Sequence, residues 1–119
     1  MIQNKSQVTY EAHGDALVIR LCGEIDHHSA VSVRTAIDEK LMLERPARVF
    51  LDLSSIEFMD SSGLGLMMGR FALVRKYGGK LAVSDPSPAV VRILSLAGMD
   101  RMIPVQYTKK NTNRKEVSK

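Results

Sequence analysis

Two adjacent serines, Ser61 and Ser62, have the setting in this sequence that is best suited to chemistry. They follow Asp60 in the stretch FMDSSGLGLMMGR, residues 58–70, and three glycines come after them. Asp60 is a plausible N-cap of a helix, which would put both hydroxyls in the first helical turn. The unpaired backbone N–H groups and the dipole of that turn favour an anion. A phosphate on either serine would add close to two negative charges at this point, and spacing alone allows either one to be the acceptor.

The glycines Gly63, Gly65 and Gly69 need an explanation, because each costs a helix roughly 1 kcal/mol relative to alanine. Gly63 and Gly65 would leave the surface beside the serines bare, so that the active site of another protein could approach the backbone closely. Alternatively, the serines only cap the helix and the glycines pack against a neighbouring element. The residues alone leave both interpretations open. A second serine pair, Ser54–Ser55, is not followed by glycines and is interpreted as turn residues.

The other chemically interesting side chains are weaker candidates. His27 and His28 are adjacent, so they point to different sides of a helix or strand and cannot easily hold one metal ion together. Glu24 and Asp26 could act as acid and base, but loop carboxylates are usually solvated or capping residues. The lone Cys22 lies in a strand-like run and is expected to be a small buried side chain. We therefore predict no catalytic residue, no metal site and no cofactor, with a phosphoryl carrier that uses His27 or His28 as an alternative.

Composition limits the possible partners. The chain has 119 residues, enough for one domain, and 45% of them are apolar and 25% charged. Its net charge of +4 is carried by residues 108–119, which include five basic residues and one acidic residue. We expect residues 1–107 to form a neutral domain without direct nucleic acid binding, followed by a basic, disordered tail. No apolar leader and no run near ~18 apolar residues is present, so a cytoplasmic protein without a membrane partner is expected.

Alternating strands and helices must position these residues. Apolar patterns predict strands over 6–12, 16–22, 47–53, 80–85 and 102–107, and helices over 30–41, from 61 to the KYGGK stretch, and over 87–98. The order ββαβαβαβ predicts an α/β fold with a mixed, largely parallel sheet that begins with an antiparallel hairpin. The serines would then lie beyond the carboxyl end of a central strand, where sites in parallel sheets tend to form.

Details of the predicted helix ends follow from single residues. Ser29 is expected to cap the first helix, and Gly78 or Gly79 fits the left-handed position that ends the second. Arg70 and two later cations would lie in the second half of that helix, the end favoured by the helix dipole.

Two motifs carry a resemblance to a known family. GEIDHHSA at 23–30 and FMDSSGLGLMMGR at 58–70 closely resemble the anti-sigma-factor antagonists of the STAS-domain family, and the match continues to about Val105. The paired histidines are similar to the branch that acts at stage II of sporulation on the anti-sigma F factor. A general stress-response antagonist would share most other features. An accessory STAS domain that binds nucleotide or touches a membrane transporter is a weaker alternative.

The resemblance implies a regulated binding protein rather than a catalyst. It implies that the dephosphorylated form binds an anti-sigma factor, which is also an ATP-dependent serine kinase, and so frees a sigma factor. Phosphorylation of the second serine of the D-S-S-G motif would block this binding, and a separate serine phosphatase would reverse it. Carried onto this sequence, the phosphoacceptor is Ser62. The residues implied to contact the partner are Asp26, His27, Asp60, Ser61, Gly63 and Gly65.

Overall fold

The sheet begins with a hairpin in the computed structural model, which describes residues 6–108. Strands β1 (Ser6–His13) and β2 (Ala16–Ile25) pair antiparallel, with Ser6 opposite Gly23 and His13 opposite Ala16. Gly14 in the connecting turn has a φ of 62°, a left-handed conformation that glycine adopts without steric cost. The predicted antiparallel hairpin is confirmed, with Gly14 and Asp15 as its turn.

Three helices and three more strands follow in alternation. They are α1 (His27–Glu44), β3 (Arg48–Met59), α2 (Ser61–Lys76), β4 (Lys80–Ser84), α3 (Pro88–Ala97) and β5 (Val105–Gln106), with a short 3-10 helix η1 (Met99–Arg101) before the last strand. The strands lie in the order β1-β2-β3-β4-β5, and all neighbours from β2 to β5 are parallel. The predicted order and the mixed sheet are confirmed, whereas η1 was not predicted.

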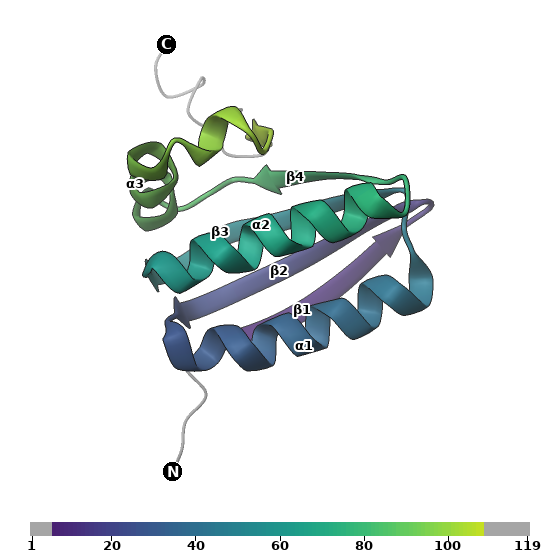
Figure 1. Ribbon diagram of the computed structural model, residues 1–119, viewed down its shortest axis with the longest axis horizontal. Helices are drawn as coiled ribbons and strands as arrows, with labels where there is room; N and C mark the ends of the chain where they lie inside the picture. The colour runs from purple at the N-terminus through teal and green to yellow at the C-terminus, as the bar shows by residue number, and fades with distance from the viewer. Residues whose placement is uncertain (1–5, 109–119) are drawn as a thin grey trace.

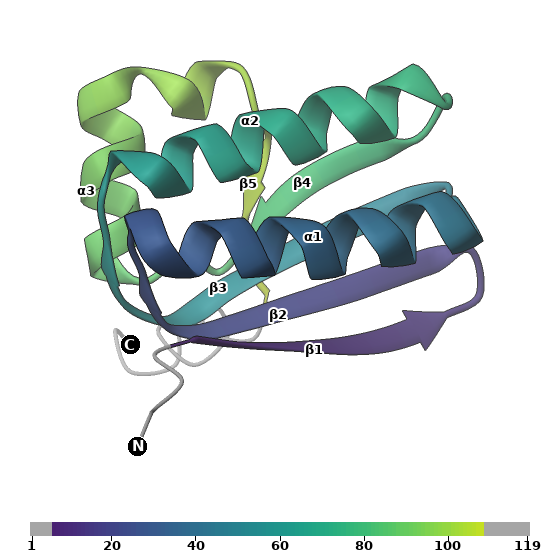
Figure 2. The same cartoon turned by 60° about the horizontal axis from the view of Figure 1, so that its bottom comes forward.

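The hydrophobic core lies between the sheet and helices α1 and α2. Alternate residues of the three central strands point into it, including Leu17, Ile19, Val49, Leu51 and Val83, all at most 1% exposed. Figures 1 and 2 both show α1 and α2 side by side on one face of the sheet, and the two helices contact each other. Because α1 follows β2 and α2 follows β3, both helices begin at the same edge of the sheet. This edge is the carboxyl end of the parallel strands, as predicted.

Helix α1 begins earlier than predicted. Its N-cap is Asp26 and not Ser29, which occupies the third helical position. The Asp26 carboxylate accepts hydrogen bonds from the backbone N–H groups of His28 and Ser29, and Ser29 Oγ accepts one in return from the Asp26 backbone N–H. This reciprocal capping box satisfies three backbone donors, whereas a lone Ser29 cap would satisfy one.

Strand β3 is longer than predicted, and Ser54–Ser55 are not turn residues. They lie inside β3, where Ser55 pairs with Cys22 between two register shifts, at each of which β3 has one residue more than β2. Pairing continues to Ile25 opposite Met59, and Met59 is buried, which makes the extension favourable. Cys22 is half-buried rather than buried, because its face of the sheet is not the one that α1 and α2 cover, and its thiol lies 3.6 Å from Gln7 Oε1.

Asp52 on β3 makes the stability of this sheet depend on pH. Its carboxylate accepts bonds from Ser54 N–H and Oγ at 3.0 and 2.7 Å and from Arg20 Nε at 2.9 Å. Burial raises the pKa of Asp52, but these bonds outweigh burial and hold the pKa below its ordinary value of 3.8. The ionised carboxylate therefore stabilises the fold above the pKa of the unfolded chain, and this contribution disappears as the pH falls through the lower folded pKa.

We expect urea midpoints measured from neutral to acidic pH to fall more steeply for the natural chain than for Asp52→Asn. The asparagine cannot ionise, so it has no proton to take up on unfolding. Parallel curves for the two proteins would contradict the assignment.

The remaining helix ends agree in part with those predicted from the sequence. Gly78 has a φ of 93° directly after the α2 cap, Gly98 ends α3 with a φ of 71°, and Pro88 is the first residue of α3. At the C-terminal side, the Asp85 carboxylate accepts bonds from Thr108 N–H and Oγ1 at 2.7 and 2.6 Å. The rest of the predicted tail, residues 109–119, lies outside the described residues. None of the helices in residues 6–108 is both long and apolar enough to cross a membrane.

Candidate functional site

Asp60 fixes the start of α2, as predicted. Its side chain accepts a hydrogen bond from the Ser62 backbone N–H at 2.8 Å, and its carbonyl accepts one from Gly63 N–H at 2.9 Å. The Asp60 N–H donates to the carbonyl of Ile25 at 3.1 Å, which ties the α2 start to the end of β2. Because Ile25 directly precedes the α1 cap Asp26, the two helix starts lie close together.

A groove of about 430 Å³ runs between the N-terminal halves of α1 and α2. It is lined by His27, Ala30, Val31 and Arg34 of α1 and by Ser62, Gly65, Leu66, Gly69 and Arg70 of α2. Three residues that were predicted from the sequence, Ser62, His27 and Gly65, therefore share one surface. This surface is the candidate site, and we call it the α1–α2 groove.

The three glycines of α2 differ in what surrounds them. Gly63 is buried, and a Cβ built there would lie within 3 Å of three side-chain atoms of Met59. At Gly65 and Gly69, by contrast, a Cβ would meet no atom of the described chain within 4 Å, apart from the helix's own neighbouring backbone. The packing of this chain therefore explains the glycine at 63, but it explains neither of the two glycines that line the groove.

Arg70 forms the charged floor of the α1–α2 groove. It is 7% exposed, and its Nε lies 2.9 Å from Asp38 Oδ1 of α1. Both atoms are buried, and neither has a hydrogen bond of good geometry within residues 6–108, so their contact is a charge pair rather than an aligned bond. Burial lowers the pKa of Arg70, Asp38 raises it, and the like charge of Arg34 lowers it further. Arg70 lies in the second half of α2, as predicted, but its guanidinium is buried against α1, which was not predicted.

The other predicted contact residues occupy the rim of the site. Ser61 is exposed and does not line the groove, whereas Asp26 and Asp60 cap the two helices that form it. The rings of His27 and His28 lie 5.6 Å apart, and only His27 lines the groove. Within residues 6–108 no cluster of three or more potential metal-ligating side chains is found.

Sequence reasoning predicted none of the other six lining residues of the groove, among which Gly69, Arg34 and Arg70 determine its shape and charge. Gly69 was noted without a role, Arg34 was not singled out, and Arg70 was placed only in the second half of its helix. The signal for Gly69 was its spacing of four from Gly65, which places both on one helical face. No local signal reveals the charge pair of Arg70, because its partner lies on another helix.

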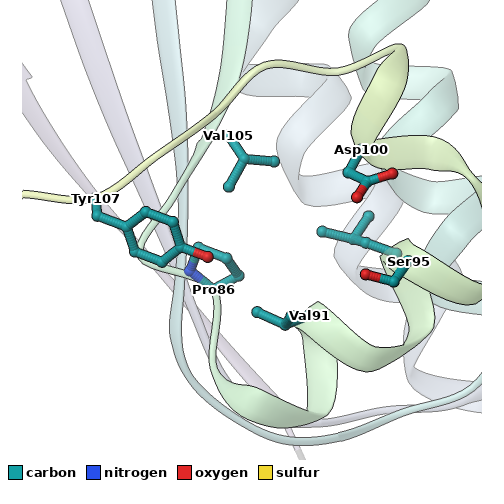
Figure 3. A pocket seen from close by; sticks show the side chains of 7 residues that line it. Pro86, Val91, Ser95, Asp100, Val105 and Tyr107 are labelled. Atoms are coloured by element: carbon teal, nitrogen blue, oxygen red, sulfur yellow. The ribbon is translucent and has the colours of Figure 1, made fainter.

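A second hollow of about 180 Å³ lies apart from this site. It is formed between α3, η1 and β5, and the lining residues are Pro86, Val91, Leu94, Ser95, Asp100, Val105 and Tyr107. In Figure 3, Tyr107 and Pro86 lie at one end and Asp100 and Ser95 at the other. None of the residues predicted from the sequence lines it.

Comparison with known proteins assigns the family. A sequence model of the STAS domain matches residues 7–112. The chain belongs to the STAS domain family. This confirms the resemblance that the motifs at 23–30 and 58–70 indicated.

The relatives of this STAS domain include antagonists of two anti-sigma factors. It is 39% identical over 99 residues to the anti-sigma F factor antagonist of Paenibacillus polymyxa, covering 83% of this chain and 85% of that protein. It is 34% identical over 89 residues to the anti-sigma-B factor antagonist of Bacillus subtilis (strain 168), covering 73% of this chain and 78% of the other.

The solved structures show the same fold. The anti-sigma factor antagonist SpoIIAA in its unphosphorylated form matches with a TM-score of 0.73 at 26% identity, covering 92% of this chain and 96% of that one. The Bacillus SpoIIAA in the phosphorylated form matches with a TM-score of 0.67 at 26% identity, covering 91% and 98%. The predicted STAS fold is therefore confirmed.

Proposed function

We propose that this STAS domain is an anti-sigma factor antagonist, a regulatory binding protein of the cytoplasm rather than an enzyme. In its dephosphorylated form it binds an anti-sigma factor that is also a serine kinase, and a sigma factor is released. The kinase then phosphorylates Ser62, which ends the binding, and a serine phosphatase restores it. The antagonists among its relatives support this role, and the 39% identity to the anti-sigma F factor antagonist favours the sporulation type.

The observation that carries the proposal is the position of Ser62 in the α1–α2 groove. Ser62 lines the groove together with Gly65, where a Cβ would meet no atom of the described chain within 4 Å beyond the neighbouring residues and helix backbone. Ser61 does not line the groove, which favours Ser62 as the acceptor. We further propose that Asp26, His27, Asp60 and the residues around Ser62 form the docking surface.

Local electrostatics supply the switch in this proposal. A phosphate on Ser62 brings about two negative charges to a point where Asp60 Oδ1 lies 2.8 Å from the Ser62 backbone nitrogen. The first turn of α2 partly stabilises this charge in the free protein. In a complex the same charge is desolvated and crowded, which costs several kcal/mol. The match to SpoIIAA in both forms supports a switch that leaves the fold unchanged.

Intact-mass and fragment-mass analysis tests the phosphorylation step. The natural chain, Ser61→Ala and Ser62→Ala are incubated with ATP and the purified anti-sigma F factor of Paenibacillus polymyxa. We expect one phosphate on the natural chain and on Ser61→Ala, and none on Ser62→Ala. Phosphate on Ser62→Ala would overturn the choice of residue, and an acid-labile phosphate would point instead to His27 or His28.

A further inference from the structure

The α1–α2 groove extends well beyond Ser62. Arg34 follows His27 by seven residues and Gly69 follows Ser62 by seven, so the two sides of the groove run along two helical turns, about 10 Å. Over this length the wall on α2 lacks side chains at Gly65 and Gly69, where the fold of the described chain leaves room for them. Each glycine costs α2 roughly 1 kcal/mol relative to alanine. A partner segment that approaches the α2 backbone accounts for this cost.

The charge of the groove is unbalanced at its far end. Two guanidinium groups, Arg34 and Arg70, line it together, and Asp38 is the carboxylate that lies within ion-pair distance of Arg70. Arg34 is exposed, and among residues 6–108 no carboxylate lies within 4 Å of it. The groove therefore offers one positive charge that the described part of the chain does not neutralise. The Cα–Cβ bonds of a helix tilt toward its N-terminus, so the Arg34 side chain leaves α1 in the direction of the Ser62 end.

We propose that Arg34 binds the carboxylate of an aspartate or glutamate of the anti-sigma factor, whose segment lies in the groove against Gly65 and Gly69. The inference rests on the proposed function and adds the chemistry of the partner. Charge complementarity selects an acidic side chain, and the bare α2 backbone admits a polypeptide segment.

This contact also adds a second way in which phosphorylation of Ser62 weakens binding. The partner's acidic side chain enters the same groove that Ser62 lines, so a phosphate on Ser62 repels it. The phosphate also competes with the carboxylate for the positive charge of Arg34. The switch then acts on a charge pair and does not depend on steric exclusion alone.

Binding measurements with the full chain test the proposal. The Kd for the anti-sigma F factor of Paenibacillus polymyxa is measured with ADP, so that no phosphate is transferred, for Arg34→Gln and Arg34→Glu. Compared with the natural chain, we expect Arg34→Gln to bind about tenfold more weakly and Arg34→Glu about a hundredfold more weakly. Binding by Arg34→Gln should also depend less on salt concentration than binding by the natural chain. The matched control is Lys80→Glu, which makes the same charge change at the exposed first residue of β4.

A stability measurement separates binding from folding. Because Arg34 is exposed and lowers the pKa of Arg70 through like charge, we expect the urea midpoint of Arg34→Glu to equal or exceed that of the natural chain. Changing the responsible acidic residue of the anti-sigma factor to lysine is expected to restore binding to Arg34→Glu.

The binding results distinguish a failure of this inference from a failure of the proposed function. If the natural chain binds and Arg34→Glu binds equally well, the acidic contact is wrong and the proposed function stands. If Lys80→Glu weakens binding as much as Arg34→Glu, the effect comes from the net charge of the chain and not from a specific contact of Arg34, and the inference is wrong. If the natural chain does not bind, the proposed function fails and the inference falls with it.

Discussion

Asp38→Leu is expected to lower the free energy of unfolding by about 2–3 kcal/mol. The substitution leaves the Arg70 guanidinium buried without its counter-charge and still close to the like charge of Arg34. Removing one partner of a fully buried pair typically costs about 3–5 kcal/mol, and we expect less here because the Asp38 side chain is 36% exposed and partly screened. Urea unfolding measures the difference.

The two partners of this pair are expected to behave differently. Arg70→Met removes the buried charge and leaves Asp38, which water can reach, so the loss should be about 1 kcal/mol. The double variant Asp38→Leu/Arg70→Met should recover most of the stability lost in Asp38→Leu. The reason is that neither charged atom has a well-aligned hydrogen bond in the pair, so an apolar contact replaces it at little cost.

A double-mutant cycle gives the coupling between Asp38 and Arg70. Equal losses for the two single variants, or a double variant that loses the sum of both, would contradict this account. The first result would mean that Asp38 is as poorly solvated as Arg70. The second would mean that the two charges do not interact.

Hydrophobic periodicity was sufficient to predict the order of strands and helices. The strands at 16–22 and 47–53 contain the alternating core residues of β2 and β3, and the buried positions of α1 recur at helical spacing at Val33, Ile37 and Leu41. The extension of β3 through Ser54 and Ser55 was not predictable, because it depends on two bulges in β3 that keep it paired with the distant strand β2. The cap of α1 was misplaced because Asp26 and Ser29 both have capping side chains, and only the folded chain shows that they cap reciprocally.

The candidate site was predictable where its signals are local. Asp60, Ser62 and the three glycines lie within ten residues of each other. The capping preference of aspartate and the cost of glycine in a helix were therefore enough to single them out. The pairing of Arg70 with Asp38 joins residues 32 positions apart and depends on how α1 packs against α2. The same is true of Arg34, whose place in the groove follows only from the parallel course of the two helices.

Replacing the glycines of α2 by alanine is expected to change the free energy of unfolding in opposite directions. Gly65→Ala and Gly69→Ala should each raise the free energy of unfolding by about 0.5–1 kcal/mol, because the added methyl meets open space and a helix prefers alanine. Gly63→Ala should lower it by about 1–2 kcal/mol. The methyl would overlap buried Met59, and the cost of displacing that side chain exceeds the gain in helix propensity. Urea unfolding of the three variants, each with the same added methyl, measures a spread of about 1.5–3 kcal/mol.

The same variants distinguish the two explanations for the glycines. If Gly65 and Gly69 are kept for a partner, their alanine variants will be more stable than the natural chain and will bind the anti-sigma factor more weakly. A stability gain that costs function is expected where a surface is shaped for binding rather than for folding. Unchanged binding by both stabilised variants would mean that the partner does not reach the α2 backbone, and the groove would lose its role in docking. If Gly65→Ala or Gly69→Ala destabilises the free chain instead, the glycine serves the fold, as Gly63 does.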